Sequence, residues 1–188
     1  MREATHIRVA GFGGQGVMMF GQILAYGATI EDLNTLWFPS YGPETRGGTA
    51  NCSVIISEDT IGSPVFQNAD HLIAFNAPSF DKFHQNMNDK GLILYNASLM
   101  SEQPHEDRLS IIGVPVNDIA NQLDNERVSN MVMLGAYLEL THIFNQHTIE
   151  TALKKFLGNR KSHMLDINLD AIEQGRAFIR NLGVNHAS

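Results

Sequence analysis

Cysteine, basic residues and long apolar runs are all scarce in this chain of 188 residues. The single cysteine, Cys52, excludes an intrachain disulfide, and it excludes a self-contained iron–sulfur cluster because such a cluster needs about four thiolates. Thirteen basic residues against twenty acidic ones leave a net charge of −7. With no block of basic residues, nucleic acid and anionic membranes are poor partners for the chain.

Signals for membrane insertion and secretion, and the motifs of several enzyme classes, are also missing. No run of about twenty apolar residues could span a bilayer, and the opening stretch "MREATHIRVAG" has no apolar core of a signal peptide. We therefore expect a cytoplasmic protein. There is no G-x-S-x-G elbow for acyl-enzyme chemistry, and the closest histidine pair, His142 and His147, lacks the spacing of two metal ligands on one helix face. We expect no metal site and no catalytic residue.

The length and the pattern of apolar runs indicate one α/β domain over residues 1–188. We divide it into a strand-rich part (1–116), a helical part (117–183) and a tail (184–188). Two near-continuous apolar runs, "HLIAFN" and "GLILYN", are typical of strands covered on both faces. The expected strands are 7–10, 36–38, 50–57, 71–76, 91–96 and 109–116, and the expected helices are 17–28, 77–90, 128–144, 148–158 and 166–183.

A glycine-rich turn follows the first expected strand. Gly11, Gly13 and Gly16 match G-x-G-x-x-G, with Gly14 and Gln15 between them, and the free N–H groups of the next helix would attract a phosphate or carboxylate. The same glycines would equally serve a tight turn that packs the helix onto the sheet. No lysine follows for a Walker loop, and no acidic residue ends the next strand to bind a ribose. A dinucleotide site is therefore the minority interpretation.

The segment "WFPSYGPETRGGTANC" (37–52) is the second candidate site. It combines aromatic residues, prolines and the loop Glu44, Thr45, Arg46, Gly47 and Gly48. Glu44 and Arg46 could simply pair at the surface. A lone arginine before two glycines also suits an interface carboxylate or a phosphate. Cys52 closes the segment and is expected to be a buried strand residue.

Five segments of the sequence together resemble a known protein family. They are, in chain order, "GFGGQGV", "YGPETRGGTANCSVIIS", "ADHLIAFNAPSFDKF", "NERVSNMVMLGA" and "NLDAIEQGRAF". With these segments the sequence resembles the gamma subunit of 2-oxoacid:ferredoxin oxidoreductases. The resemblance is greatest to the 2-oxoglutarate branch (2-oxoglutarate synthase). The resemblance covers nearly the whole chain except the loop around "MSEQPHEDRLS" and the termini. It implies a layered α/β/α domain with a mostly parallel central sheet, like the gamma domain of pyruvate:ferredoxin oxidoreductase.

The resemblance implies a subunit that is inactive alone. Such complexes convert a 2-oxoacid, coenzyme A and oxidised ferredoxin to acyl-coenzyme A (succinyl-coenzyme A from 2-oxoglutarate), carbon dioxide and reduced ferredoxin. Thiamine diphosphate, Mg²⁺ and 4Fe–4S clusters would be held mainly by the alpha, beta and delta chains. This chain alone would bind no cofactor, and it would self-associate when isolated through a surface that its partners normally cover.

On this basis the glycine loop (Gly11–Gly16) and the Glu44–Gly48 loop are expected to lie side by side and face partner subunits. Arg46 would pair with a partner or with a phosphate of coenzyme A, and Glu44 would orient it. Asn130 and Gly135 are expected to be structural. Two alternatives stay open: the equivalent subunit of a branched-chain, pyruvate or indolepyruvate oxidoreductase, and a free-standing dinucleotide-binding protein.

Overall fold

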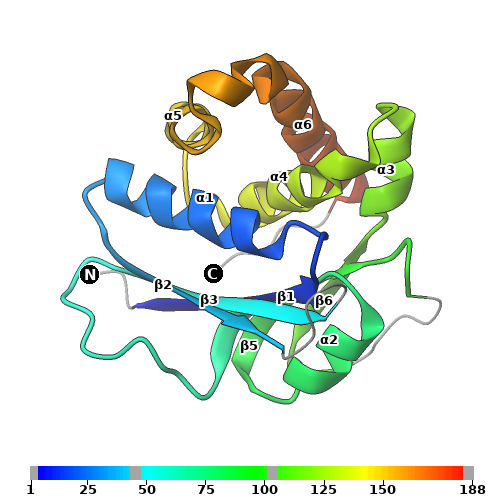
Figure 1. Cartoon of the computed structure of the whole chain (residues 1–188). Coiled ribbons are helices and arrows are strands. Elements are labelled where there is room, and N and C mark those ends of the chain that lie inside the picture. The colour runs from blue at the N-terminus through cyan, green and yellow to red at the C-terminus, as the bar shows by residue number, and fades with distance from the viewer. Residues whose placement is uncertain (1–3, 43–47, 101–105, 184–188) are drawn as a thin grey trace.

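The computed structural model describes residues 4–42, 48–100 and 106–183. A six-stranded sheet lies between helices, with α1, α4, α5 and α6 on one face and α2 on the other (Figure 1). The elements in chain order are β1 (Thr5–Phe12), α1 (Val17–Ile30), β2 (Asn34–Tyr41), β3 (Thr49–Ser57), β4 (Ala69–Ala74), α2 (Ala77–Phe83), β5 (Met87–Asn96), β6 (Ser110–Val114), α3 (Val116–Gln122), the 3₁₀ helix η1 (Glu126–Val128), α4 (Ser129–Thr141), α5 (Gln146–Leu157), η2 (Asn159–Met164) and α6 (Leu165–Leu182).

The strands run in the order β2-β3-β1-β4-β5-β6. The pairs β1–β4, β4–β5 and β5–β6 are parallel, whereas β3 is antiparallel to both β1 and β2. This confirms the predicted layered α/β/α fold with a mostly parallel sheet. Helices cover both faces of β4 and β5, which explains why their sequences are apolar without alternation.

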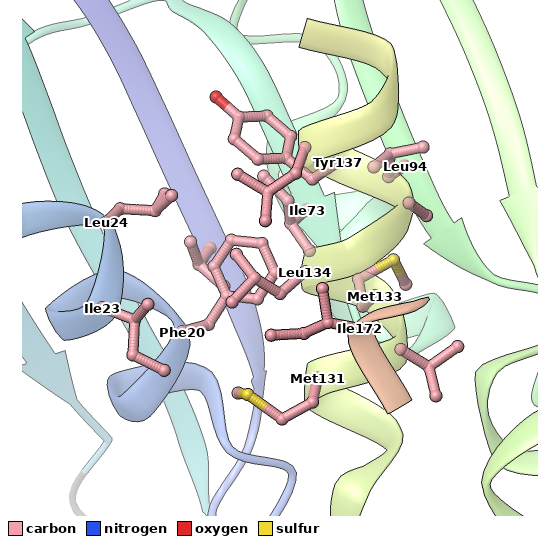
Figure 2. Packing of buried hydrophobic residues seen from close by; sticks show 14 of the residues in the cluster. Phe20, Ile23, Leu24, Ile73, Leu94, Met131, Met133, Leu134, Tyr137 and Ile172 are labelled. Carbon is pink, nitrogen blue, oxygen red and sulfur yellow. The ribbon is translucent and has the colours of Figure 1, made fainter. Parts of the chain in front are cut away.

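The larger core lies between the sheet and the helices α1, α3, α4, α5 and α6, and Figure 2 shows part of it. Phe20, Ile23 and Leu24 of α1 meet Leu134 and Tyr137 of α4 there, and all five side chains are fully buried. A smaller core under the opposite face packs Phe80 of α2 against β4 and β5. Burial on both faces places the ends of the central strands, rather than the faces of the sheet, within reach of a ligand or partner.

Two glycines allow α4 and α6 to pack with their backbones in contact. A Cβ on Gly135 would overlap the carbonyl oxygen of Ile172, and a Cβ on Gly175 would overlap that of Val132. Gly135 is therefore a close-packing position, as predicted. The loss of helix propensity at glycine, about 1 kcal/mol, is offset by this close approach.

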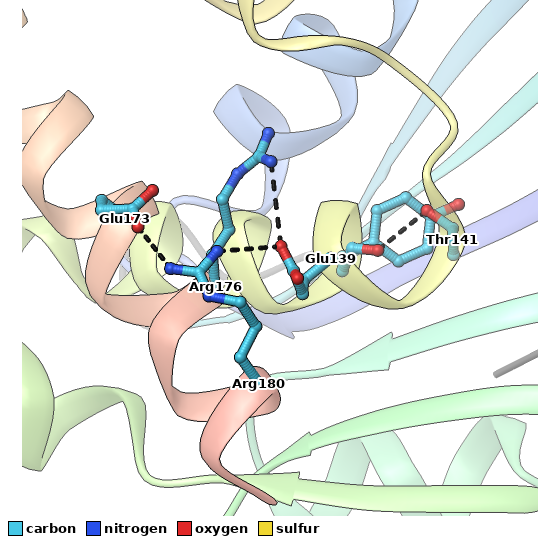
Figure 3. Close-up of polar contacts among 6 residues, drawn as sticks. Glu139, Thr141, Glu173, Arg176 and Arg180 are labelled. Atoms are coloured by element: carbon cyan, nitrogen blue, oxygen red, sulfur yellow. Dashed lines mark hydrogen bonds and ion pairs between the residues drawn. The ribbon is translucent and has the colours of Figure 1, made fainter. Parts of the chain in front are cut away.

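Charged residues also join the same two helices (Figure 3). Glu139 of α4 accepts a hydrogen bond from Arg180 at 3.3 Å and lies 3.9 Å from Arg176, and Arg180 also bonds Glu173. The hydrogen bond that Arg180 donates to Glu173 is the main cause of the raised pKa of Arg180. The four residues strengthen the contact between the helices.

The region from 77 to 96 differs from the prediction. We predicted a helix over 77–90, but α2 ends at Phe83 and β5 already begins at Met87. Met87 is buried and pairs with Ala69 at the start of β4, and Lys90 adopts a positive φ of 63° where the register of the strand pair shifts. Pairing with β4 therefore prevails over the helical pattern of the polar residues that follow α2. The predicted tail, 184–188, lies outside the described residues.

Candidate functional site

The carboxyl ends of β1, β4, β5 and β6 meet at one edge of the sheet because the four strands are mutually parallel. The chain leaves β1 toward α1 on one face and leaves β4 toward α2 on the other face (Figure 1). Between strands whose connections diverge in this way, open α/β sheets usually have a ligand crevice. The predicted glycine loop lies at this point, so the crevice between β1 and β4 is the first candidate site.

The glycine loop makes a tight turn with two residues in the left-handed region. Gly14 has φ 98° and Gly16 has φ 78°. The N–H of Gln15 donates to the carbonyl of Phe12 at 3.2 Å, and the N–H of Gly13 donates to the carbonyl of Gly48 at 3.0 Å. The second bond joins the glycine loop to the last residue of the predicted interface loop. The other residues of that loop, Glu44, Thr45, Arg46 and Gly47, lie outside the described part of the chain.

The Gln15 side chain fills the crevice that a dinucleotide would need. Its Oε1 accepts hydrogen bonds from the N–H of Phe12 at 2.7 Å and from Nδ2 of Asn76 at 2.8 Å. Its Nε2 donates to the carbonyl of Phe75 at 3.3 Å. A Cβ on Gly11 would lie 2.8 Å from Oε1, so glycine at position 11 makes room for this side chain. The inner side of the loop is occupied by the protein itself.

Asn96, at the end of β5, extends this amide network. Its Nδ2 donates to the carbonyl of Phe75 at 3.3 Å and to Oδ1 of Asn117 at 2.7 Å, and its Oδ1 accepts from the N–H of Ser98 at 3.1 Å. Asn76 and Asn96 are only 5% and 1% exposed. Asn76 also caps α2, because its Oδ1 accepts the N–H of Ser79. Side-chain amides therefore tie together the loops that follow the four parallel strands.

Asn130, at the start of α4, covers the N-terminus of α1. It is 4% exposed, its Nδ2 lies 3.5 Å from the carbonyl oxygen of Gly16, and a Cβ on Gly16 would overlap its side chain. The predicted structural role of Asn130 agrees with this position. Gln15 and Asn130 therefore both lie close to the N-terminus of α1, where a pyrophosphate would bind.

Exposed backbone and large apolar side chains are both present at this edge. Gly13 and Gly14 are exposed, and no atom lies within 4 Å of a Cβ placed on Gly14. Tyr41, at the end of β2, and Leu99, after β5, are 68% and 52% exposed. Exposed large apolar residues beside open backbone suit a protein partner better than a small charged ligand.

The described residues do not fit an iron–sulfur cluster or a metal ion of their own. Cys52 is a fully buried strand residue, as predicted, and its Sγ lies 3.6 Å from the carbonyl oxygen of Val17. Burial raises the pKa of this thiol to about 12, so it stays protonated at neutral pH. Over the described ranges, no three His, Cys, Asp or Glu side chains gather as metal ligands, and none of the helices is long and apolar enough to cross a membrane.

Among the described residues, β2 does not supply the acidic partner that nicotinamide cofactors require. β3 lies between β1 and β2, so the end of β2 is not beside the glycine loop as it would be in a dinucleotide-binding unit. β2 ends at Tyr41 and carries no acidic residue. The strand order and the lack of an acidic residue in β2 therefore both argue against a dinucleotide site.

Comparison with known proteins places these features in a family. The family model for pyruvate ferredoxin/flavodoxin oxidoreductase matches residues 6–178. The chain is 40% identical over 178 residues to the ketoisovalerate oxidoreductase subunit VorA of Methanothermobacter thermautotrophicus, covering 94% of this chain and 36% of the relative. It is 34% identical over 157 residues to the 2-oxoglutarate synthase subunit KorC of Methanocaldococcus jannaschii, covering 81% of this chain and 83% of the relative.

A solved structure shows the same fold. The gamma subunit of keto/oxoacid ferredoxin oxidoreductase from Geobacter sulfurreducens matches 94% of this chain and 99% of its own, with a TM-score of 0.79 and 28% identity. The chain spans about a third of the ketoisovalerate relative but nearly all of this gamma subunit. The chain belongs to the pyruvate ferredoxin/flavodoxin oxidoreductase family.

Proposed function

We propose that the chain is the gamma subunit of a 2-oxoacid:ferredoxin oxidoreductase and has no activity alone. The observation that carries the proposal is its match to a stand-alone gamma subunit over 99% of that protein's length. The site is consistent with it, because the side chains of Gln15 and Asn130 occupy space beside the glycine loop that a dinucleotide would need. Thiamine diphosphate, Mg²⁺ and 4Fe–4S clusters would then belong to the alpha, beta and delta chains.

The complex would oxidise a 2-oxoacid with coenzyme A and pass the electrons to ferredoxin. Two substrates are candidates. The sequence segments quoted above favour 2-oxoglutarate, and 34% identity to a 2-oxoglutarate synthase subunit supports it. Identity of 40% to a ketoisovalerate oxidoreductase subunit supports a branched-chain 2-oxoacid instead. Because this chain's crevice is filled by its own amides, we place the discrimination between the two on other chains.

In this proposal the chain contributes a surface. The hydrogen bond between Gly13 and Gly48 holds the glycine loop against the last residue of the Glu44–Gly48 loop, and both loops would face the partner chains. Arg46 would pair with a partner carboxylate or a phosphate of coenzyme A, and Glu44 would orient it. Arginine suits either ion because its planar guanidinium can donate two parallel hydrogen bonds.

Anaerobic affinity isolation of the tagged chain from its native cells tests the assignment. We expect partner chains to co-purify with iron and thiamine diphosphate. A chain that emerges alone with a bound nucleotide would contradict it and favour the free-standing dinucleotide-binding protein. The role of Arg46 is tested separately in the isolated complex: Arg46→Ala should weaken assembly or raise the KM for coenzyme A, whereas Arg127→Ala, on η1, should change neither.

A further inference from the structure

Arg8 lies in the middle of β1, and its side chain is on the α2 side of the sheet. In the strand pairing it stands opposite Leu72 of β4, which belongs to the smaller core on that side. Its Cζ lies 4.8 Å from the ring centroid of Phe66 and 5.0 Å from that of Phe83, the last residue of α2. Both rings attract the cation through their electron-rich faces. The guanidinium is therefore held in position at the margin of the smaller core.

This guanidinium has no carboxylate partner among the described residues. Burial lowers the pKa of Arg8, because the partly desolvated cation is not balanced by a negative charge. Asp70 of β4 accepts hydrogen bonds from the N–H of His6 and from Nδ2 of Asn88 instead. The arginines that do lie within 4 Å of a carboxylate oxygen are Arg108, Arg176 and Arg180.

Part of the guanidinium remains open to solvent. Nη2 of Arg8 donates to the carbonyl of Phe66 at 3.3 Å. Nε and Nη1 make no hydrogen bond within the described part of the chain, and neither atom is fully buried. An anion that reaches this surface can therefore accept hydrogen bonds from them.

The sheet beside Arg8 is exposed and carries no acidic residue on this side. Arg8 stands opposite Ser53 of β3, and Ser53 stands opposite Phe38 of β2, which is 52% exposed. α2 packs against β1 and β4, toward the other end of the sheet (Figure 1). The residues that alternate onto the α2 side of β1, β2 and β3 are His6, Arg8, Ala10 and Phe12, then Asn34, Leu36, Phe38 and Ser40, then Thr49, Asn51, Ser53, Ile55 and Ser57.

We propose that a partner chain of the oxidoreductase docks on this surface and pairs one of its aspartate or glutamate side chains with Arg8. The inference rests on the proposed function and adds a contact away from the carboxyl-end loops. Charge selects the group: although the chain has a net charge of −7, this surface carries Arg8 and no carboxylate, and exposed charges elsewhere are screened beyond about 8 Å.

Phe38 indicates that the anion belongs to a protein. A small anion on Arg8 would leave this ring exposed, whereas a docked chain covers it. Arginine and aromatic side chains are enriched in the buried centres of protein interfaces. The ion pair would hold the partner in register, and the ring would supply apolar contact.

Anaerobic isolation of a tagged copy of the chain, from cells that also make the untagged chain, tests the proposal. We expect Arg8→Gln to lower the amount of partner chains recovered per tagged chain at least about tenfold, because the partner's carboxylate loses its cation. Arg127→Gln is the matched control. Arg127 is an exposed arginine on η1, and its substitution should leave recovery unchanged.

Ser53→Glu tests the same contact without removing Arg8. A glutamate at this position lies directly opposite Arg8 and can pair with it inside the chain. The melting temperature of the isolated chain should therefore not fall, whereas the recovery of partner chains should drop severalfold. Ser53→Gln, of the same size but uncharged, should recover more partner than Ser53→Glu.

Equal recovery of partner chains by the wild-type, Arg8→Gln and Ser53→Glu chains would overturn the proposal and leave the proposed function intact. Arg8 would serve a small anion instead if inorganic phosphate raised the melting temperature of the wild-type chain but not of Arg8→Gln, with assembly unchanged in the variant. A wild-type chain that recovers no partner chains would contradict the proposed function, and this inference with it.

Discussion

Replacing Gln15 with alanine removes the side chain that closes the crevice between β1 and β4. Oε1 of Gln15 accepts two hydrogen bonds, from the N–H of Phe12 and from Nδ2 of Asn76, and alanine leaves both donors without that acceptor. The carbonyl of Phe75 loses Nε2 of Gln15 but keeps Nδ2 of Asn96. The cost therefore comes mainly from the two donors.

Leaving a buried polar group unpaired costs about 1–3 kcal/mol. Asn76 is 5% exposed and Gln15 is half-buried, so water can reach part of the space that alanine opens. We expect Gln15→Ala to lower the free energy of unfolding by about 2 kcal/mol. This value is near the lower limit of the range for two unpaired donors, because water can replace part of the lost hydrogen bonding. Gln15→Glu keeps an acceptor for both donors and should lose only about 1 kcal/mol.

Urea unfolding followed by circular dichroism measures these differences. Gln146→Ala is the matched control, because Gln146 also has a side-chain hydrogen bond, to Glu150, but at the exposed surface of α5. It should change the free energy by less than about 0.5 kcal/mol. Equal losses for Gln15→Ala and Gln146→Ala, or equal losses for the alanine and glutamate variants of Gln15, would refute the view that the amide acceptor closes the crevice.

Three further predictions follow from buried groups. Gly135→Ala should lose about 1–3 kcal/mol in thermal melts despite the gain in helix propensity, because the new Cβ overlaps the carbonyl of Ile172, whereas Gly62→Ala, with open space around it, should be neutral. Cys52, with its pKa raised by burial to about 12, should react with a thiol reagent at pH 8 only after unfolding; rapid labelling of the folded chain would contradict its burial. Burial also raises the pKa of Tyr137, so its contribution to stability should be intact below about pH 10, the ordinary tyrosine pKa, and be lost as the pH rises above it. Tyr137→Phe should flatten that decline, and an unchanged pH profile would count against it.

The layered fold could be predicted from local sequence because its signals are local. The apolar runs of β4 and β5, covered on both faces, mark strands without reference to the rest of the chain. The start of β5 was predicted wrongly as helix. Met87 lies in a strand because it pairs with Ala69, and the local sequence pattern contains no information on this contact.

The site was predicted only in part for a related reason. The glycine spacing identifies the turn, but Gln15 closes it through Asn76, 61 positions along the chain. Amides follow no sequence period, and their partners are set by which strands end side by side. A missing acidic residue at the end of the next strand was the one sequence signal that argued against a dinucleotide, and the position of β3 between β1 and β2 gives its structural basis.

The most direct test of the proposed subunit role is an anaerobic dye-reduction assay on the assembly isolated through this chain, supplied with coenzyme A and either 2-oxoglutarate or ketoisovalerate. Our account predicts reduction that requires coenzyme A and one of the two acids, and no reduction by this chain purified alone. An isolated chain that binds NAD tightly, with no 2-oxoacid-dependent activity in anything that co-purifies with it, would contradict the account.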